Sequence, residues 1–151
     1  MFGRTTQSFH ILLVEDNLGD IRLAEEALIE SPIEGKLHVT RNGDETLSFL
    51  RREGRFQGIP IPDLILLDLN LPGMNGHEIL QKIKEDENIS AIPVVVFSTS
   101  CSEDEVLRSY SLRANSHRSK PMEFTQYQET MNSILECFSP DLGREALPFI
   151  A

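Results

Sequence analysis

Four short segments of the sequence carry acidic, hydroxyl or basic side chains directly after a run of aliphatic residues. Glu15-Asp16 follows the first run, Asp68 ends the second, Ser98-Thr99 ends the third, and Lys120-Pro121 follows a weaker fourth. Asp68 is the most informative of these residues, because segment 64–68 is otherwise purely aliphatic and ends in a charge. Either this strand has simply reached water, or it holds a reactive carboxylate in place.

The residue types in these segments suit phosphoryl transfer with a divalent cation. Carboxylates that lie close together raise each other's pKa unless a cation neutralises them. Mg²⁺ suits such a group, because it binds a few carboxylates and keeps several waters. Glu15, Asp16 and Asp68 supply the carboxylates, and Asn70 can add its backbone carbonyl. The sequence therefore predicts a magnesium site.

A carboxylate can also attack phosphorus and form an aspartyl phosphate, which makes Asp68 the expected phosphoacceptor. The charge of a transferred phosphoryl group is spread over three oxygens, so catalysis depends on positioning and on nearby cations. We expect Mg²⁺ at one oxygen, Lys120 at another, and a hydrogen bond from Ser98 at the third.

The alternation of aliphatic runs and amphipathic segments predicts the elements that position these residues. Aliphatic or alternating runs predict strands at 10–14, 36–40, 64–68, 93–98 and 115–120. Helical spacing of apolar residues predicts helices around 21–28, 46–50, 79–83, 103–112 and 124–138. Strands that alternate with helices form a parallel sheet covered on both faces. We predict an α/β fold, a doubly wound five-stranded parallel sheet in the flavodoxin-like order 2-1-3-4-5.

This strand order places the first, third, fourth and fifth strands side by side. Ligands of doubly wound sheets bind beyond the carboxyl ends of the strands. Glu15-Asp16, Asp68, Ser98 and Lys120 all fall at such ends. We therefore expect the whole candidate site on one rim of the sheet.

Length and composition restrict the other classes of protein. The 151 residues are expected to form one domain at 8–138 and a tail at 139–151. The net charge of −10 opposes direct nucleic-acid binding, because each phosphate contact needs a cation. No apolar run approaches the roughly 20 residues that span a bilayer. Cys101 and Cys137 are too few for a disulfide scaffold, so we expect free thiols and a cytoplasmic protein.

The set Glu15-Asp16, Asp68, Ser98 and Lys120-Pro121 resembles the receiver domain of bacterial two-component response regulators, over roughly residues 8–138. Segments 14–23 and 62–76 resemble in particular the small stand-alone regulators that serve cyanobacterial phytochrome-type histidine kinases. The resemblance implies a signalling phosphoprotein rather than an enzyme, with a sensor histidine kinase of this type as the phosphodonor. It also implies a cis Lys120-Pro121 bond.

The resemblance assigns a conformational switch to Ser98 and to the residue three positions before Lys120, where receivers commonly carry an aromatic side chain. Here that residue is His117, which leaves open a receiver-like interaction module with an atypical switch. Nothing after Phe138 is long enough for an output domain, so we expect signalling through conformational change and protein contact. The resemblance favours a homodimer through the fourth helix, fifth strand and last helix.

Two other classes share this sheet order but fit the sequence less well. A flavin carrier offers hydroxyls and amides to a phosphate in its first loop, where Glu15-Asp16 would repel it. A phosphatase with an aspartate nucleophile normally carries it on the first strand, with a second aspartate two residues later. Here Asn70 takes the place of that second aspartate. Among the remaining histidines, we expect structural roles for His10 and His38 and a surface position for His77.

Overall fold

The computed structural model describes residues 8–140. Its elements are, in order, β1 (His10–Val14), α1 (Leu18–Glu30), β2 (Lys36–Thr40), α2 (Gly43–Arg51), the short 3₁₀ helix η1 (Gly54–Phe56), β3 (Leu64–Leu67), α3 (Gly76–Glu85), β4 (Val94–Ser98), α4 (Glu103–Ser111), β5 (Ser116–Ser119) and α5 (Phe124–Phe138). Every predicted strand and helix is present. Most of the predicted tail lies outside the described residues.

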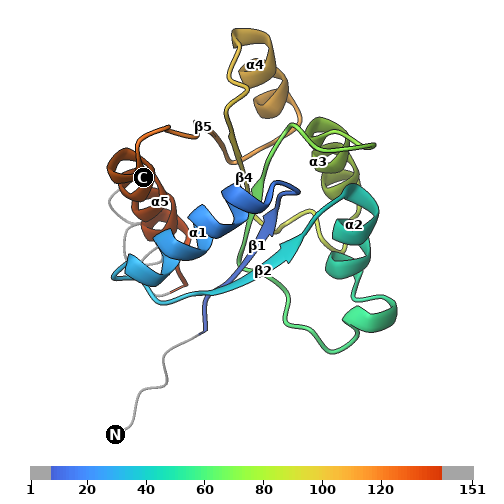
Figure 1. Cartoon of the computed structure of the whole chain (residues 1–151). Coiled ribbons are helices and arrows are strands. Elements are labelled where there is room, and N and C mark those ends of the chain that lie inside the picture. The colour runs from blue at the N-terminus through green and yellow to red at the C-terminus, as the bar shows by residue number, and fades with distance from the viewer. Residues whose placement is uncertain (1–7, 141–151) are drawn as a thin grey trace, which may run out of the picture.

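The strands form one parallel sheet in the order β2-β1-β3-β4-β5, which confirms the predicted topology. Figure 1 shows the strands in the centre of the molecule, with helices on both sides. The register pairs Val14 with Leu67, and Leu67 with Val96, so the carboxyl ends of these strands lie level. Ser98 pairs with Ser119 at the end of β4. The rim that should hold the site is thus continuous across four strands.

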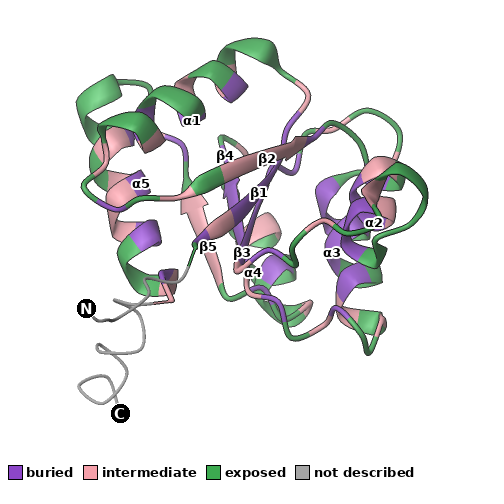
Figure 2. Ribbon diagram, turned by 90° about the horizontal axis from the view of Figure 1, so that it is seen from below, coloured by how far each residue is buried: buried purple, intermediate pink, exposed green. Residues whose placement is uncertain are grey.

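Alternation along the strands divides the core into two clusters, one on each face of the sheet. Ile11 and Leu13 pack with side chains of α1 and α5. Leu12 and Val14 point the other way and pack with side chains of α2 and α3. Figure 2 shows the buried residues on the central strands and on the inward sides of the helices. Because the central strands are covered on both faces, they provide a rigid base for the rim.

Polar side chains cap the N-termini of four of the helices. The side chains of Asn17, Asn42, Asn75 and Ser102 each accept a hydrogen bond from a backbone N–H of the first turn of α1, α2, α3 and α4, respectively. Such caps satisfy N–H groups that have no partner inside a helix. The caps therefore fix where each loop after a strand ends and the next helix begins.

Helix α4 is attached to the rest of the protein differently from the other helices. Its single buried residue is Ser109, whereas Leu107 and Tyr110 are 60% and 49% exposed. The neighbouring strand β5 reads Ser-His-Arg-Ser and is only partly buried. This side of the molecule therefore has little apolar core, in contrast to the central strands.

Two predictions about local structure are wrong. Residues 8–140 contain no cis peptide bond, so the Lys120-Pro121 bond is trans, which is the favoured isomer even before proline. His77 is buried, at 8% exposure, because α3 turns this side chain toward α4, where it meets Ser109. Within the same residues, no helix is both long and apolar enough to cross a membrane.

Candidate functional site

Asp68 follows β3 directly and is held from its backbone outward. Its N–H donates to the carbonyl of Val14 at 3.2 Å, which ties it to β1. The loop after it returns to start α3 at Gly76, where an added Cβ would lie 2.4 Å from the carbonyl oxygen of Asp68. Only glycine allows this close approach without a shift of the backbone. The side chain of Asp68 is 8% exposed and thus nearly enclosed.

Three groups contact the carboxylate of Asp68. The hydroxyl of Ser98 donates to Oδ1 at 2.9 Å, and the N–H of Asn70 donates to the same oxygen at 3.3 Å. The ammonium of Lys120 lies 3.5 Å from Oδ2. The carboxylate therefore has a hydroxyl on one side and a cation on the other.

Lys120 connects several carboxylates at the rim. Its Nζ lies 2.5 Å from Glu15 Oε1 and 3.6 Å from Asp20 Oδ2. Its backbone N–H donates to the carbonyl of Ser98 at 3.0 Å, which fixes the chain next to β4. Burial alone would lower the pKa of Lys120, but the hydrogen bond with Glu15 and the charges of Asp68, Glu15 and Asp20 outweigh it and raise the pKa. The ammonium therefore stays charged at neutral pH.

Glu15 is the most deeply buried acid of the rim, at 1% exposure. Burial raises the pKa of Glu15, although the hydrogen bond from Lys120 opposes the shift. Its second carboxylate oxygen accepts the N–H of Asn17 at 3.2 Å. Glu15 thus holds Lys120 close to Asp68 and links β1 to the start of α1.

The structure brings Glu15, Asp68, Ser98 and Lys120 together, as the strand order predicts. Asp16 follows Glu15 in the sequence and is half-buried, and its backbone carbonyl accepts a hydrogen bond from Arg41. The sequence reasoning missed Asp20. The available signal was its position four residues after Asp16, in the first turn of a helix that starts at the same rim.

This constellation agrees with comparisons to known proteins. The family model described as response regulator receiver domain matches residues 11–132. The chain belongs to the response regulator receiver family. Such domains are signalling modules of two-component systems, and phosphorylation with a bound divalent metal is their general behaviour.

Several members of the receiver family are closely similar to this chain. Response regulator Rcp1 of Synechocystis sp. is 46% identical over 110 residues, which cover 73% of this chain and 75% of that protein. A second similar protein is RcpA, solved as the crystal structure of the phosphorylated cyanobacterial phytochrome response regulator. Its sequence is 41% identical and its TM-score is 0.83, and the match covers 89% of this chain and 96% of the RcpA chain. The Mn²⁺-bound form of Rcp1 is 39% identical, with a TM-score of 0.80, and covers 87% and 95%, respectively.

The residues of this receiver fit a divalent cation by their chemistry. Glu15, Asp20 and Asp68 surround one ammonium group, that of Lys120, so the ionised set has excess negative charge. No three His, Cys, Asp or Glu side chains in residues 8–140 are arranged to hold a metal by themselves. Mg²⁺ does not need such a cage, since it is commonly held by one or two carboxylates and keeps several waters. The backbone carbonyl of Asn70 remains a predicted ligand.

His117, the predicted partner of Ser98 in the switch, is in this receiver held by polar contacts. Its Nδ1 lies 2.8 Å from Ser109 Oγ, and its Nε2 lies 3.1 Å from the carbonyl oxygen of Ser100 and 3.4 Å from Cys101 Sγ. The imidazole therefore reaches the loop after β4 through Ser100, two residues beyond Ser98.

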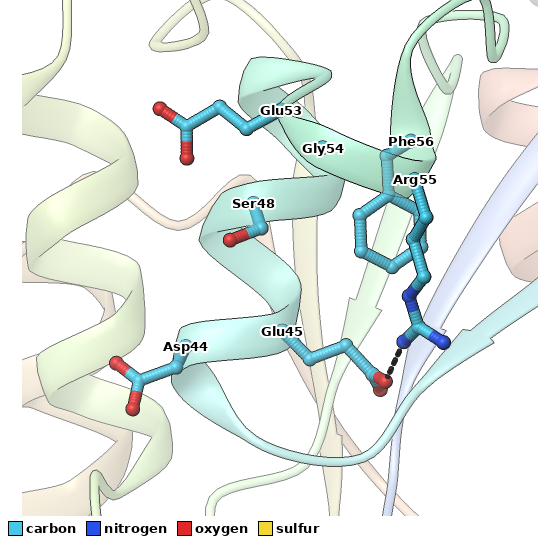
Figure 3. A pocket seen from close by; sticks show the side chains of 7 residues that line it. All are labelled: Asp44, Glu45, Ser48, Glu53, Gly54, Arg55 and Phe56. Carbon is cyan, nitrogen blue, oxygen red and sulfur yellow. Dashed lines mark hydrogen bonds and ion pairs between the residues drawn. The ribbon is translucent and has the colours of Figure 1, made fainter.

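A hollow of about 370 Å³ lies at α2 and η1 and contains none of the predicted site residues. Figure 3 shows Arg55 reaching back to Glu45 across this hollow. The guanidinium of Arg55 also lies over the ring of Phe56, 4.5 Å from its centroid. These contacts attach η1 to α2, so the residues that line the hollow have a structural role in the packing of these two elements.

Proposed function

We propose that Asp68 accepts a phosphoryl group from a phosphohistidine of a sensor kinase, with Mg²⁺ as the cofactor. The observation that carries this proposal is the carboxylate of Asp68, enclosed between the hydroxyl of Ser98 and the ammonium of Lys120. A nucleophile held on a rigid strand end beside a cation suits phosphoryl transfer, where positioning and charge supply most of the catalysis.

In the proposed reaction, an oxygen of Asp68 forms a bond to phosphorus while the bond from phosphorus to the histidine nitrogen of the kinase breaks. The ammonium of Lys120 leaves the carboxylate of Asp68 and pairs with a phosphoryl oxygen. The hydroxyl of Ser98 turns from Asp68 Oδ1 to a second phosphoryl oxygen. Glu15, Asp16, Asp68 and the backbone carbonyl of Asn70 are the proposed metal ligands. When bound, the cation neutralises the charge of the phosphoryl oxygens.

The kinase is proposed from the relatives. RcpA is described as a cyanobacterial phytochrome response regulator, and its similarity to this chain supports a phytochrome-type histidine kinase as the partner. We further propose that the protein has no catalytic output of its own and does not bind nucleic acid, consistent with its net charge of −10. Two exposed free cysteines, Cys101 and Cys137, suit a reducing compartment such as the cytoplasm.

Incubation with Mg²⁺ and acetyl phosphate, followed by intact-mass measurement, tests the phosphoacceptor. We expect one phosphate that hydroxylamine removes, and none on Asp68→Asn or in the presence of a chelator. Asp44→Asn is the matched control, because Asp44 is exposed on α2 and outside the rim. A phosphate added to the Asp68→Asn protein at the wild-type rate would overturn the assignment.

We also propose a homodimer through the face formed by α4, β5 and α5. Large apolar side chains are exposed here, including Leu107, Tyr110 and Met122, and such patches commonly mark protein contacts. Both charges are present as well, from Arg108, Arg113, Arg118, Glu123, Glu129 and Glu136. A two-fold axis can bring such a mixed surface into contact with itself.

A further inference from the structure

Ser109, the single buried residue of α4, lies between two imidazoles. Its hydroxyl oxygen is 2.9 Å from Nε2 of His77 on α3 and 2.8 Å from Nδ1 of His117 on β5. Ser109 is fully buried, and His77 is 8% exposed. Because α4 buries no apolar residue, this polar junction is its one fully buried contact with the neighbouring elements.

The chemistry of the partners fixes the direction of each hydrogen bond when both imidazoles are neutral. The carbonyl of Ser100 can only accept, so Nε2 of His117 must carry the proton. Nδ1 of His117 is then an acceptor and receives the hydroxyl proton of Ser109. The hydroxyl oxygen in turn accepts the N–H of His77 Nε2. Donation thus runs one way, from α3 through α4 to β5.

The same direction continues to the phosphoacceptor. The N–H of Ser100 donates to Ser98 Oγ at 3.1 Å, and the hydroxyl of Ser98 donates to Asp68 Oδ1. A chain of contacts therefore connects His77 through Ser109, His117, Ser100 and Ser98 to Asp68. At Ser100 the connection passes through the backbone, because its carbonyl and its N–H belong to different peptide groups. The far end of the chain, His77, lies in the first turn of α3, directly after Gly76, which packs against the backbone carbonyl of Asp68.

Ser109 gives this chain two discrete arrangements. A hydroxyl carries one proton, so it can donate to His117 or to His77 but not to both. If Ser100 moves away from His117, the imidazole proton of His117 can shift to Nδ1. The Ser109 hydroxyl must then turn to Nε2 of His77, whose own proton moves from Nε2 to Nδ1. A two-state element of this kind is what energetic coupling between two sites requires.

We propose that these hydrogen bonds transmit the phosphorylation state of Asp68 to α4 and α3. Ser109 is the positioning residue at which the direction of hydrogen-bond donation reverses. The inference rests on the proposed function, because phosphorylation of Asp68 is the event that draws Ser98 and Ser100 to a new arrangement. The charged and titratable groups that face the chain are Arg108 and Glu105 of α4, Cys101 of the preceding loop, and Tyr110, whose hydroxyl accepts the N–H of His117.

Nitrogen NMR of the histidine imidazoles in the intact protein tests the chain in two stages. In the resting protein at mildly alkaline pH, we expect both His77 and His117 as the Nε2-protonated tautomer. After phosphorylation by acetyl phosphate, confirmed by intact mass, we expect the imidazole signals of both residues to shift. A resting His117 protonated at Nδ1 would overturn the inference without any variant.

Ser109→Ala cuts the chain between the two imidazoles and keeps a good helix former in α4. We expect His117 to respond to phosphorylation in this variant as before, and the response of His77 to be lost. Ser111→Ala is the matched control, because Ser111 lies on the same helix, is exposed, and bonds only to the carbonyl of Arg108. It should behave as the wild type.

The outcomes separate this inference from the proposed function. A phosphorylated wild-type protein with an unchanged His77 would overturn the inference alone, as would an undiminished His77 response in Ser109→Ala. A protein that gains no phosphate would overturn both.

Discussion

At the scale of single residues, the rim is an ionic cluster with one cation among several acids. Lys120 reduces the repulsion between the carboxylates of this cluster, because its ammonium lies near Glu15, Asp20 and Asp68 at once. Removing one partner of a buried ion pair leaves an uncompensated charge. The lysine is therefore expected to serve both the resting structure and the reaction.

Lys120→Met tests this double role. We expect phosphorylation by acetyl phosphate to slow about 10²-fold, since loss of one group that stabilises the transition state has effects of this order. Metal binding should persist or strengthen, because the carboxylates lose their competing cation. Rates follow from intact-mass time courses, and metal affinity from calorimetry.

Lys82→Met is the control for Lys120→Met, because Lys82 is exposed on α3. A wild-type phosphorylation rate in Lys120→Met would contradict the role given to the ammonium.

At the scale of elements, most of the site follows from where the strands end. The aliphatic run before Asp68 and the order of strands were enough to place Glu15, Asp68, Ser98 and Lys120 on one rim. The position of Asp20 depends on how α1 is turned, and that of Ser109 on how α4 approaches β5. These are packing relations between elements, and they leave no periodic pattern in the sequence.

The burial of His77 is another packing relation that the sequence does not predict. A histidine near the start of a helix is usually exposed, and nothing in its own segment indicates the serine on α4 that buries it. Nor does the sequence explain why glycine is needed beside it, at position 76. The reason is the carbonyl of Asp68, 2.4 Å from where a Cβ would lie.

Gly76→Ala should therefore displace the loop between β3 and α3. We expect a loss of roughly 1–3 kcal/mol in the free energy of unfolding, the usual cost of forcing a methyl group into a packed site. Phosphorylation should also slow, because the backbone of Asp68 must shift. Urea unfolding and intact-mass rates measure the two effects.

Gly19→Ala provides the comparison within the same protein. Gly19 lies in the first turn of α1, where an added Cβ would lie 3.1 Å from Oδ1 of Asn17, a side-chain oxygen that can shift more easily than backbone. Alanine should change the free energy of unfolding there by no more than about 1 kcal/mol, because its higher helix propensity offsets any disturbance of the cap. Equal losses in the two variants would refute the steric explanation.

At the scale of the whole molecule, stability should depend on pH through the half-buried His38 and the buried His77. Burial lowers the pKa of His38, and the charges of His10 and Lys36 add to this effect. Burial also lowers the pKa of His77, with a further contribution from Arg108. The unfolded chain therefore binds more protons than the native protein just below the ordinary histidine pKa of 6.5.

The stabilisation from His38 and His77 is therefore complete above the pKa that these histidines have in the unfolded chain. It is lost as the pH falls toward their lower pKa values in the folded protein. We expect the urea concentration at the midpoint of unfolding to decrease when the pH is lowered from about 7.5 to about 5.5. His77→Gln keeps a donor for Ser109 but cannot titrate, so its decrease should be smaller. An identical decrease in wild type and variant would exclude a contribution from His77.

The proposed dimer also belongs to this scale. Sedimentation of the resting and phosphorylated protein should show a dimer that Arg118→Glu weakens, because the substitution places a negative charge beside the acidic side chains of α5. Arg22→Glu on α1 is the matched charge reversal outside this face and should have no effect. A monomer in both states would contradict the proposal.

The crowding of acids around Lys120 has a consequence for how loss-of-function variants behave in a cell. Enclosing Asp68 among other carboxylates favours chemistry at the expense of folding, a familiar conflict between activity and stability. Replacing it with asparagine keeps an acceptor for Ser98 and removes one of the repelling charges. The silenced protein should therefore be at least as abundant as the active one, and it would compete with it for the same kinase. A cell carrying both copies would then show a dominant defect rather than a recessive one.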